Sequence, residues 1–445
     1  NSVKISGTVQ NPESEVVILR YFPIFGEAIT DSFKLDEAGT FSGTIKLNEE
    51  TLYTFNHGRE YANIYLTPQD DITIKLDATD FDKSLIYEGK GAKANNFLQS
   101  KILTEAQLLP EFEELYRLPY EEFVENLKDW KDKLQTDFSI IENPSPAFTK
   151  MAQADIDFDW ASKQLMYPRY YRYFTKNEEA PMDMVNYNFL GKLDMTDTDL
   201  LKSPKFRDFV SQYSQHIMEQ KLEKDESAAG TKRIGRYLLD YATIGELFNN
   251  KVIQDFAKTQ LMSNLVRYEG IIAGTDSLMN VYEGEVKNAD YIAHVQSDYK
   301  KWESIREGAT APDFTTETVE GTPKKLSDFQ GQYVYIDVWA TWCGPCRKEI
   351  PHLEDLQAEY SDKNIAFVSV SIDETRDPWA KMVMEKEMKG NQLYTEGAWN
   401  ASITQDYNIR GIPRFMLIGT DGKIIDANAP RPSGDIKNVL EELSI

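Results

Sequence analysis

Two cysteines, Cys343 and Cys346, are the residues whose type and spacing point most directly to chemistry. They are the only cysteines in 445 residues, and they enclose Gly344 and Pro345 directly after Trp342. The motif follows an apolar run typical of a strand and opens a pattern typical of a helix. Since a helix N-terminus stabilises an anion, we expect a lowered pKa for the Cys343 thiol. Its thiolate would open a disulfide, and Cys346, one turn further on, would resolve the mixed disulfide.

A zinc site or a pair of structural thiols is the alternative for the same cysteines. Zinc usually takes four ligands, and His352 is the only histidine near the pair. Two inert buried thiols would not need a Gly-Pro spacer at the start of a helix. The sequence therefore favours redox chemistry, with no metal and no cofactor other than the Cys343–Cys346 dithiol or disulfide itself.

Two acidic residues lie close to the cysteines in sequence. Asp337 stands six residues before Cys343 in an otherwise apolar strand, where burial would raise its pKa. Such a carboxylate beneath Cys346 would accept the proton of that thiol as it attacks. The alternative for Asp337 is a position at the strand edge, facing solvent. Glu349, three residues after Cys346, would lie on the neighbouring helical turn. There it would either tune the chemistry of the cysteine pair or lie on the solvated surface.

Alternating strands and helices must position these residues. Strands are predicted at 333–339, 365–372, 415–418 and 423–426, and helices at 343–360, 378–388 and 435–443. Alternation of this kind predicts a sheet with helices on both faces. The segment begins after a Gly-Ala-Thr-Ala-Pro boundary, and we place this α/β domain at residues 304–445.

Two further domains are predicted before it. Residues 1–90 alternate with period two between turn residues, which is typical of a small antiparallel β sandwich. Residues 91–303 have helical periodicity, as in the apolar stripe formed by Phe123, Leu127, Trp130, Leu134 and Phe138. The sequence thus predicts a multidomain chain with a β sandwich, an all-α middle domain and an α/β domain.

Composition excludes several classes of protein and partner. Lys and Arg total 49 against 73 Asp and Glu, a net charge of −24, and no concentrated basic patch is present. Phosphate repulsion therefore disfavours nucleic acid as a partner. No apolar run approaches the length of a transmembrane helix. Two cysteines also exclude a disulfide scaffold.

Several motifs in the last third of the chain occur together. They are Ala311–Phe314, Leu326–Phe329, Val338–Cys346, Glu349–Pro351 and Gly411–Pro413. Together they resemble the TlpA/ResA-like branch of the thioredoxin fold, over about residues 305–445. The first 90 residues are similar to a β domain that precedes such modules in some envelope proteins of Gram-negative bacteria.

The resemblance implies a role for each motif residue. Cys343 would be the nucleophile, Cys346 the resolving thiol, Asp337 the buried acid and Glu349 the acidic residue beside the site. Pro413 would be a cis-proline facing the cysteines, and the Ile412 backbone would pair with a substrate strand. Substrate would also contact Trp342, Gly344 and Pro345. One departure is that residues 365–372 contain no Lys, whereas thioredoxins place one opposite the buried acid.

The leading prediction is a thiol-disulfide oxidoreductase that reduces protein disulfides in the periplasm or cell envelope of a Gram-negative bacterium. We expect protein substrates and an upstream electron donor, and an export signal or membrane tether that preceded Asn1. A thiol peroxidase is one alternative, although Ile336 and Ala340 occupy the Pro and Thr/Ser places of the peroxidatic pattern. The other is a binding or assembly protein whose thioredoxin-like domain is accessory.

Overall fold

The computed structural model describes residues 2–177, 185–224, 227, 233–443 and 445. The chain forms two compact units, one of residues 1–231 and 238–260 and the other of residues 232–237 and 261–445. The predicted boundaries after residues 90 and 303 fall inside these units. The three-part division therefore remains a prediction, and each unit is described by itself.

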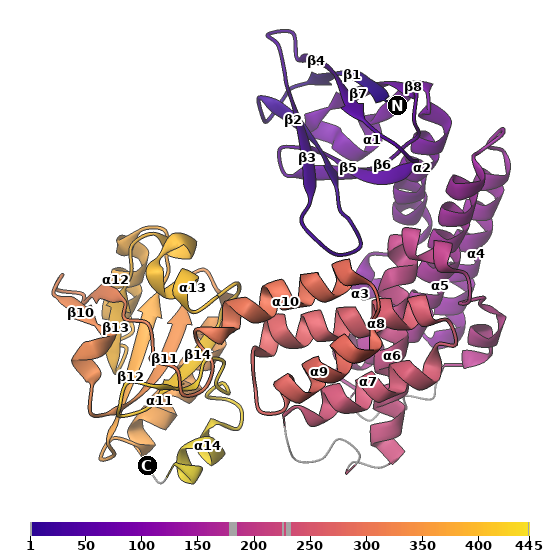
Figure 1. Ribbon diagram of the computed structural model, residues 1–445. Coiled ribbons are helices and arrows are strands. Elements are labelled where there is room, and N and C mark those ends of the chain that lie inside the picture. Colours follow the sequence, from indigo (N-terminus) through magenta and orange to yellow (C-terminus); the bar gives the residue numbers. More distant parts are fainter. Residues whose placement is uncertain (1, 178–184, 225–226, 228–232, 444) are drawn as a thin grey trace. The chain divides into compact units, whose positions relative to one another are not determined.

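The first unit begins with a β sandwich (Figure 1). Its sheets have the strand orders β4-β1-β7-β8 and β3-β2-β5-β6, and their apolar faces share one core. β1 and β7 pair in parallel, which departs from the all-antiparallel prediction, because the chain passes through the other sheet between them. The strands are β1 (Ser2–Gln10), β2 (Val16–Tyr21), β3 (Ile29–Lys34), β4 (Thr40–Lys46), β5 (Thr51–His57), β6 (Glu60–Leu66), β7 (Asp71–Asp77) and β8 (Ile86–Lys90).

Helices follow the sandwich, as the change of periodicity predicts. The stripe on α4 is buried at Phe123, Leu127, Trp130 and Leu134, so its apolar face packs inward. None of the helices described by the structure is long and apolar enough to span a membrane. They are α1 (Phe81–Ser84), α2 (Ala92–Leu108), α3 (Phe112–Arg117), α4 (Tyr120–Ser139), α5 (Pro146–Thr175) and α6 (Pro204–Lys224), with α7 (Gly235–Leu247) and α8 (Lys251–Asn264) shared between the units.

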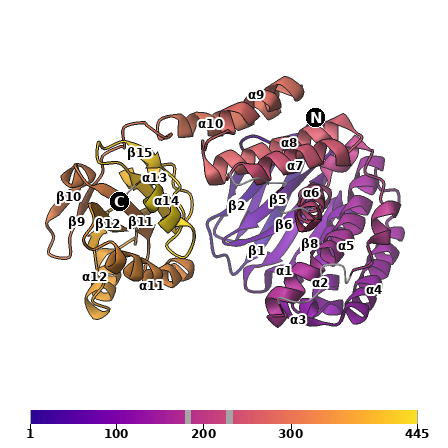
Figure 2. The same ribbon diagram turned by 90° about the horizontal axis from the view of Figure 1, so that it is seen from below.

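The second unit contains α9 (Thr275–Glu285) and α10 (Ala289–Glu303), and then the α/β region that carries the two cysteines. In Figure 2, α10 leads to the part of that domain that contains β15. The domain's sheet has the order β10-β9-β13-β12-β11-β14-β15. Its strands are β9 (Thr315–Glu317), β10 (Pro323–Lys325), β11 (Tyr333–Trp339), β12 (Ile365–Ser371), β13 (Asn391–Tyr394), β14 (Arg414–Ile418) and β15 (Ile424–Asp426).

Helices cover both faces of this sheet. In Figure 1, α11 (Gly344–Glu359) and α14 (Ile436–Glu442) lie on one side, and α12 (Arg376–Glu385) and α13 (Ser402–Asp406) on the other. Residues of α11 and α14 share one core with β11, β12 and β14. Since β11 and β12 are parallel and buried, with Trp339 opposite Ser371, their carboxyl ends meet at the edge where the cysteines lie.

Candidate active site

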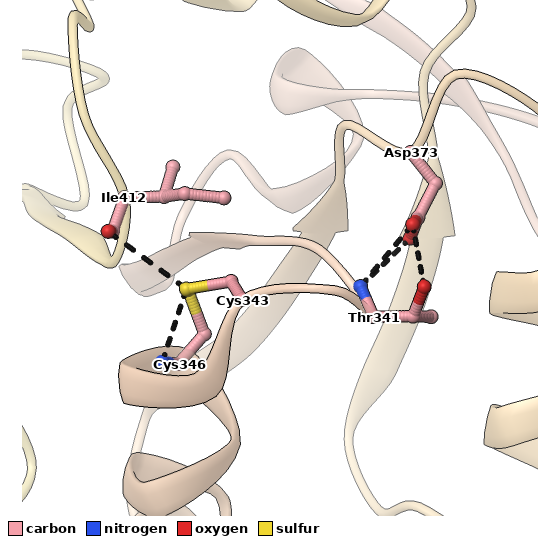
Figure 3. The surroundings of a disulfide bond; sticks show 5 residues. All are labelled: Thr341, Cys343, Cys346, Asp373 and Ile412. Carbon is pink, nitrogen blue, oxygen red and sulfur yellow. Dashed lines mark hydrogen bonds between the residues drawn. A yellow bond between two sulfur atoms is a disulfide. The ribbon is translucent and has the colours of Figure 1, made fainter. Parts of the chain in front are cut away.

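Cys343 is the residue that caps the N-terminus of α11. Its Sγ accepts a hydrogen bond at 3.1 Å from the backbone N–H of Cys346, one of the helix's otherwise unpartnered donors (Figure 3). The two cysteines form a disulfide bond, and both are nearly fully buried. Pro345 fits in the first turn because no helical hydrogen bond requires its N–H. A negative charge on Cys343 would gain from the same donor and from the helix dipole.

The Ile412–Pro413 segment faces the disulfide from a distant part of the chain. The Ile412 carbonyl oxygen lies 3.8 Å from Cys343 Sγ, as Figure 3 shows, and the Ile412–Pro413 peptide bond is cis. Pro413 immediately precedes β14, which pairs antiparallel with β11. The sheet thus brings the backbone before β14 to the sulfur that follows β11.

Asp373 holds the loop that carries the cysteines. Its carboxylate accepts hydrogen bonds from the Thr341 N–H at 3.0 Å and the Thr341 hydroxyl at 2.6 Å (Figure 3), and from the Ser371 hydroxyl at 2.7 Å. Asp373 follows β12 by two residues and Thr341 follows β11 by two, so the parallel register places them opposite each other. The buried carboxylate therefore fixes the backbone just before Trp342 and Cys343.

Asp337 is buried in the middle of β11, with only 6% of its surface exposed. Burial, together with repulsion from Glu349, raises its pKa to about 8, and a hydrogen bond from Ser369 opposes the rise. Ser369 is its register partner on β12, in the stretch that lacks a Lys. Asp337 Oδ1 has no hydrogen-bond partner among the described residues. The alternative of a solvent-facing position at the strand edge is thus wrong.

Glu349 is also buried, so the solvated-surface alternative is wrong for this residue. Its two carboxylate oxygens accept hydrogen bonds from Ser433, one from the backbone N–H at 3.0 Å and one from the hydroxyl at 2.8 Å. Glu349 is close enough to Asp337 for the two carboxyl groups to repel each other. The helix that carries Cys346 therefore brings a second buried acid close to Asp337.

Trp342, the residue directly before Cys343, pairs with a second exposed tryptophan ring. Trp342, which precedes Cys343, is 57% exposed, and its ring centroid lies 6.4 Å from that of Trp399. The Trp399 carbonyl oxygen accepts hydrogen bonds from the Thr404 hydroxyl at 2.9 Å and the Gln405 side chain at 2.7 Å. The residue directly before Cys343 thus shares a partly exposed apolar surface with Trp399, whose backbone is held by two hydrogen bonds.

The structure brings the predicted site residues to one region of the second unit. Cys343, Cys346 and the backbone of Ile412 are in contact, and Asp337 and Glu349 are linked by charge. Sequence reasoning missed Asp373, Thr341, Ser433 and Trp399. Asp373 carried a signal, since it ends a buried strand that runs parallel to the one before the cysteines. No group of three or more His, Cys, Asp or Glu suited to a metal ion occurs in the described ranges.

Comparison with known proteins identifies the family of this region. A family model described as Redoxin matches residues 306–443. The thiol-disulfide oxidoreductase ResA of Bacillus cereus is 32% identical over 130 residues, which are 29% of this chain and 73% of that protein. The chain belongs to the ResA-like thiol-disulfide oxidoreductases. The thioredoxin-like protein YneN of Bacillus subtilis is 35% identical over 131 residues, 29% of this chain and 76% of that protein.

Two solved structures are similar to about the same share of the chain. The thioredoxin domain of a thiol-disulfide oxidoreductase from Bacteroides vulgatus is 31% identical, with a TM-score of 0.29, and covers 32% of this chain and 99% of its own. A thiol:disulfide interchange protein from a Bacteroides species is 30% identical, with a TM-score of 0.29. The match covers 31% of this chain and 90% of that protein's chain. Each of these matches spans less than a third of the present chain.

Proposed function

We propose that this oxidoreductase reduces disulfide bonds of protein substrates through Cys343 and Cys346. The observation that carries the proposal is the Cys343 sulfur, which caps α11 and lies 3.8 Å from the Ile412 carbonyl oxygen. One side of the sulfur thus receives hydrogen bonding that favours a thiolate, and the other meets backbone able to pair with an extended substrate.

The reaction has two steps and transfers two electrons. The Cys343 thiolate attacks one sulfur of the substrate disulfide, which forms a mixed disulfide and releases the other sulfur as a thiolate. Cys346 then attacks Cys343 Sγ, which forms the Cys343–Cys346 bond and releases the second substrate thiolate. The substrate is reduced to a dithiol, and a dithiol electron donor returns the cysteine pair to its reduced state.

Asp337 serves the second step as a proton acceptor. Cys346 must lose its proton to attack. The carboxylate form of Asp337, which is the minority form at neutral pH because its pKa is about 8, is basic enough to accept that proton. Glu349 increases the basicity of Asp337 by repelling its negative charge. The buried pair of acids therefore matches proton transfer inside a site from which water is largely excluded.

The direction and location of the reaction follow by analogy. Thioredoxin, which has the same Gly-Pro spacer, has a potential of about −270 mV, so a reducing role is proposed here too. A periplasmic or envelope location, with an electron donor there, rests on the family resemblance. Contacts of substrate with Trp342, Gly344, Pro345, Ile412 and Pro413 belong to the same proposal.

The test is to trap the mixed disulfide in the full chain. In a Cys346→Ser variant the second step is blocked, so reduced insulin chains should remain attached to Cys343, and a Cys343→Ser variant should trap nothing. Wild-type protein should reduce insulin catalytically. A potential near −120 mV would contradict the reductase direction, because a strong oxidant has a potential of about that value. Peroxide consumption that is faster than insulin reduction and is lost in Cys343→Ser would contradict the proposal that protein disulfides are the substrates.

A further inference from the structure

One face of α10 contacts the chain on both sides of the Ile412–Pro413 bond. Asp298 and Trp302, one helical turn apart on α10, meet Arg410 and Arg414 respectively. All four residues lie within the second compact unit. A segment of five residues that carries the backbone facing Cys343 is thus held at its two ends by one helix.

The contact at Arg414 is buried. Its guanidinium carbon lies 4.8 Å from the centroid of the Trp302 ring, and its Nε donates a hydrogen bond at 2.9 Å to the Ala427 carbonyl oxygen. Trp302 is 1% exposed and Arg414 is 7% exposed. Arg414 Nη2 has no hydrogen-bond partner among the described residues, so the guanidinium depends on the tryptophan face and on the nearby Asp426 and Glu269 carboxylates.

The position of the Trp302 ring is itself fixed. Gly270 has a φ of +79°, and a Cβ added there would lie 2.5 Å from a carbon of the ring. A glycine is therefore required where the backbone passes against the indole. The ring is held between that backbone and the Arg414 guanidinium.

The contact at the other end is an ion pair with a buried anion. Asp298 is 5% exposed, and its Oδ1 lies 3.3 Å from Arg410 Nη2. Arg267 at 3.3 Å and Lys301 at 3.1 Å surround the same carboxylate. Two neighbouring cations keep Asp298 ionised and in place, so it remains a fixed point for Arg410.

We propose that Asp298 and Trp302 are positioning residues, which hold the Ile412–Pro413 segment in the place where a protein substrate must pair with it. The inference rests on the proposed function, since it concerns the binding of a disulfide-bearing polypeptide. Because both ends of the segment are attached to α10, a shift of this helix moves the Ile412 backbone relative to Cys343. The helical residues 261–303 thereby act on substrate binding without touching the substrate.

The first test compares two tryptophan substitutions in the full chain. Trp302→Leu removes the face on which Arg414 rests. Trp379→Leu is the matched control, because Trp379 is also fully buried and has Arg376 over its ring at 5.7 Å, but it lies on α12. We expect KM for insulin to rise about fivefold or more in Trp302→Leu, with kcat nearly unchanged, whereas Trp379→Leu leaves KM unchanged. Reduction of a small disulfide such as hydroxyethyl disulfide should be unaffected in both.

The second test measures the segment itself and requires no activity. Hydrogen exchange of the backbone in residues 409–416 should become faster in Trp302→Leu and Arg410→Gln, and remain as in the wild type in Trp379→Leu. Asp298→Asn should not add to the effect of Arg410→Gln on exchange in residues 409–416, because the Asp298–Arg410 ion pair is the contact of Asp298 that reaches this segment. Unchanged exchange in Trp302→Leu, or an equal KM effect in both tryptophan variants, would overturn the proposal. If exchange becomes faster in Trp302→Leu but the wild-type protein does not reduce insulin, only the proposed function is contradicted.

Discussion

Asp337 on β11 lies directly opposite Ser369 on β12, so the buried carboxyl group faces a neutral hydroxyl group. With Glu349 as the nearby charge and burial as the larger cause, the pKa of Asp337 rises to about 8. At neutral pH the group is therefore mostly protonated in the folded chain, and mostly ionised in the unfolded chain.

Replacing Asp337 by Asn should flatten the pH dependence of stability. The unfolded pKa is about 3.9, so between about pH 4 and pH 8 the folded state holds a proton that the unfolded state has lost. The stability from this group is complete below pH 4 and falls by up to about 1.4 kcal/mol per pH unit as the pH rises to 8. Urea unfolding of the oxidised protein at pH 5 and pH 8 measures the slope. Asp355→Asn, at an exposed position on α11, is the control, and an equal slope in wild type and Asp337→Asn would contradict the assignment.

Replacing Glu349 by Gln should lower the pKa of Asp337. The substitution removes the negative charge that repels the Asp337 carboxylate and keeps an oxygen that can accept from Ser433. The titration of the Asp337 carboxyl carbon, followed by NMR, should move to lower pH. Glu354→Gln on the same helix should leave the titration in place. A midpoint that does not move in Glu349→Gln would show that burial alone sets this pKa.

Replacing Thr341 by Val should destabilise the oxidised protein by about 1.5–3 kcal/mol, because the Asp373 carboxylate then loses the Thr341 hydroxyl donor inside the protein. Val keeps the shape of Thr, so packing changes little. Thr341→Ser retains the hydroxyl and should cost much less. Urea unfolding at pH 7 compares the three proteins. Equal losses for Val and Ser would mean that the methyl group, and not the hydrogen bond, matters.

Replacing Trp399 by Ala should weaken binding of protein substrates. Trp399 extends the exposed apolar surface of Trp342 next to Cys343, and large aromatic side chains often dominate the free energy of binding. We expect KM for insulin to rise about threefold to tenfold, with reduction of hydroxyethyl disulfide unchanged. Trp399→Phe keeps an aromatic ring at this position and should raise KM less than Trp399→Ala does. Met384→Ala, which removes an exposed apolar side chain on α12, is the control, and an equal rise there would contradict a specific contact.

The local parts of the site could be predicted because they depend on neighbouring residues. The strand before Cys343 and the helix after it follow from apolar patterning and the Gly-Pro spacer, and the predicted strand 333–339 coincides with β11. Asp337 was conspicuous as a single carboxyl group in an apolar run. Whether it faced the interior depended on covering helices, which the pattern of one strand does not show.

The parts that could not be predicted depend on contacts between distant segments. Ser433, which binds Glu349, lies 84 residues further along the chain, and no periodicity links the two. The stripe on a helix shows which face is buried but not what covers it. For α10, the pattern could not show that Trp302 meets Arg414 and that this helix belongs to the same compact unit as the redox site.

The tryptophan under Arg414 also limits how the chain can be divided. A fragment cut at residue 304, where the pattern of strands and helices begins, would lose Trp302 and expose the guanidinium group and the apolar surface around it. A cut before Leu261 keeps α9, α10 and Gly270 with the redox site. We therefore expect a fragment that begins at residue 261 to be more stable than the shorter segment that its relatives share with it. Grafting that shared segment alone onto another protein would transfer the cysteines without α10, the helix that holds the Ile412–Pro413 segment facing them.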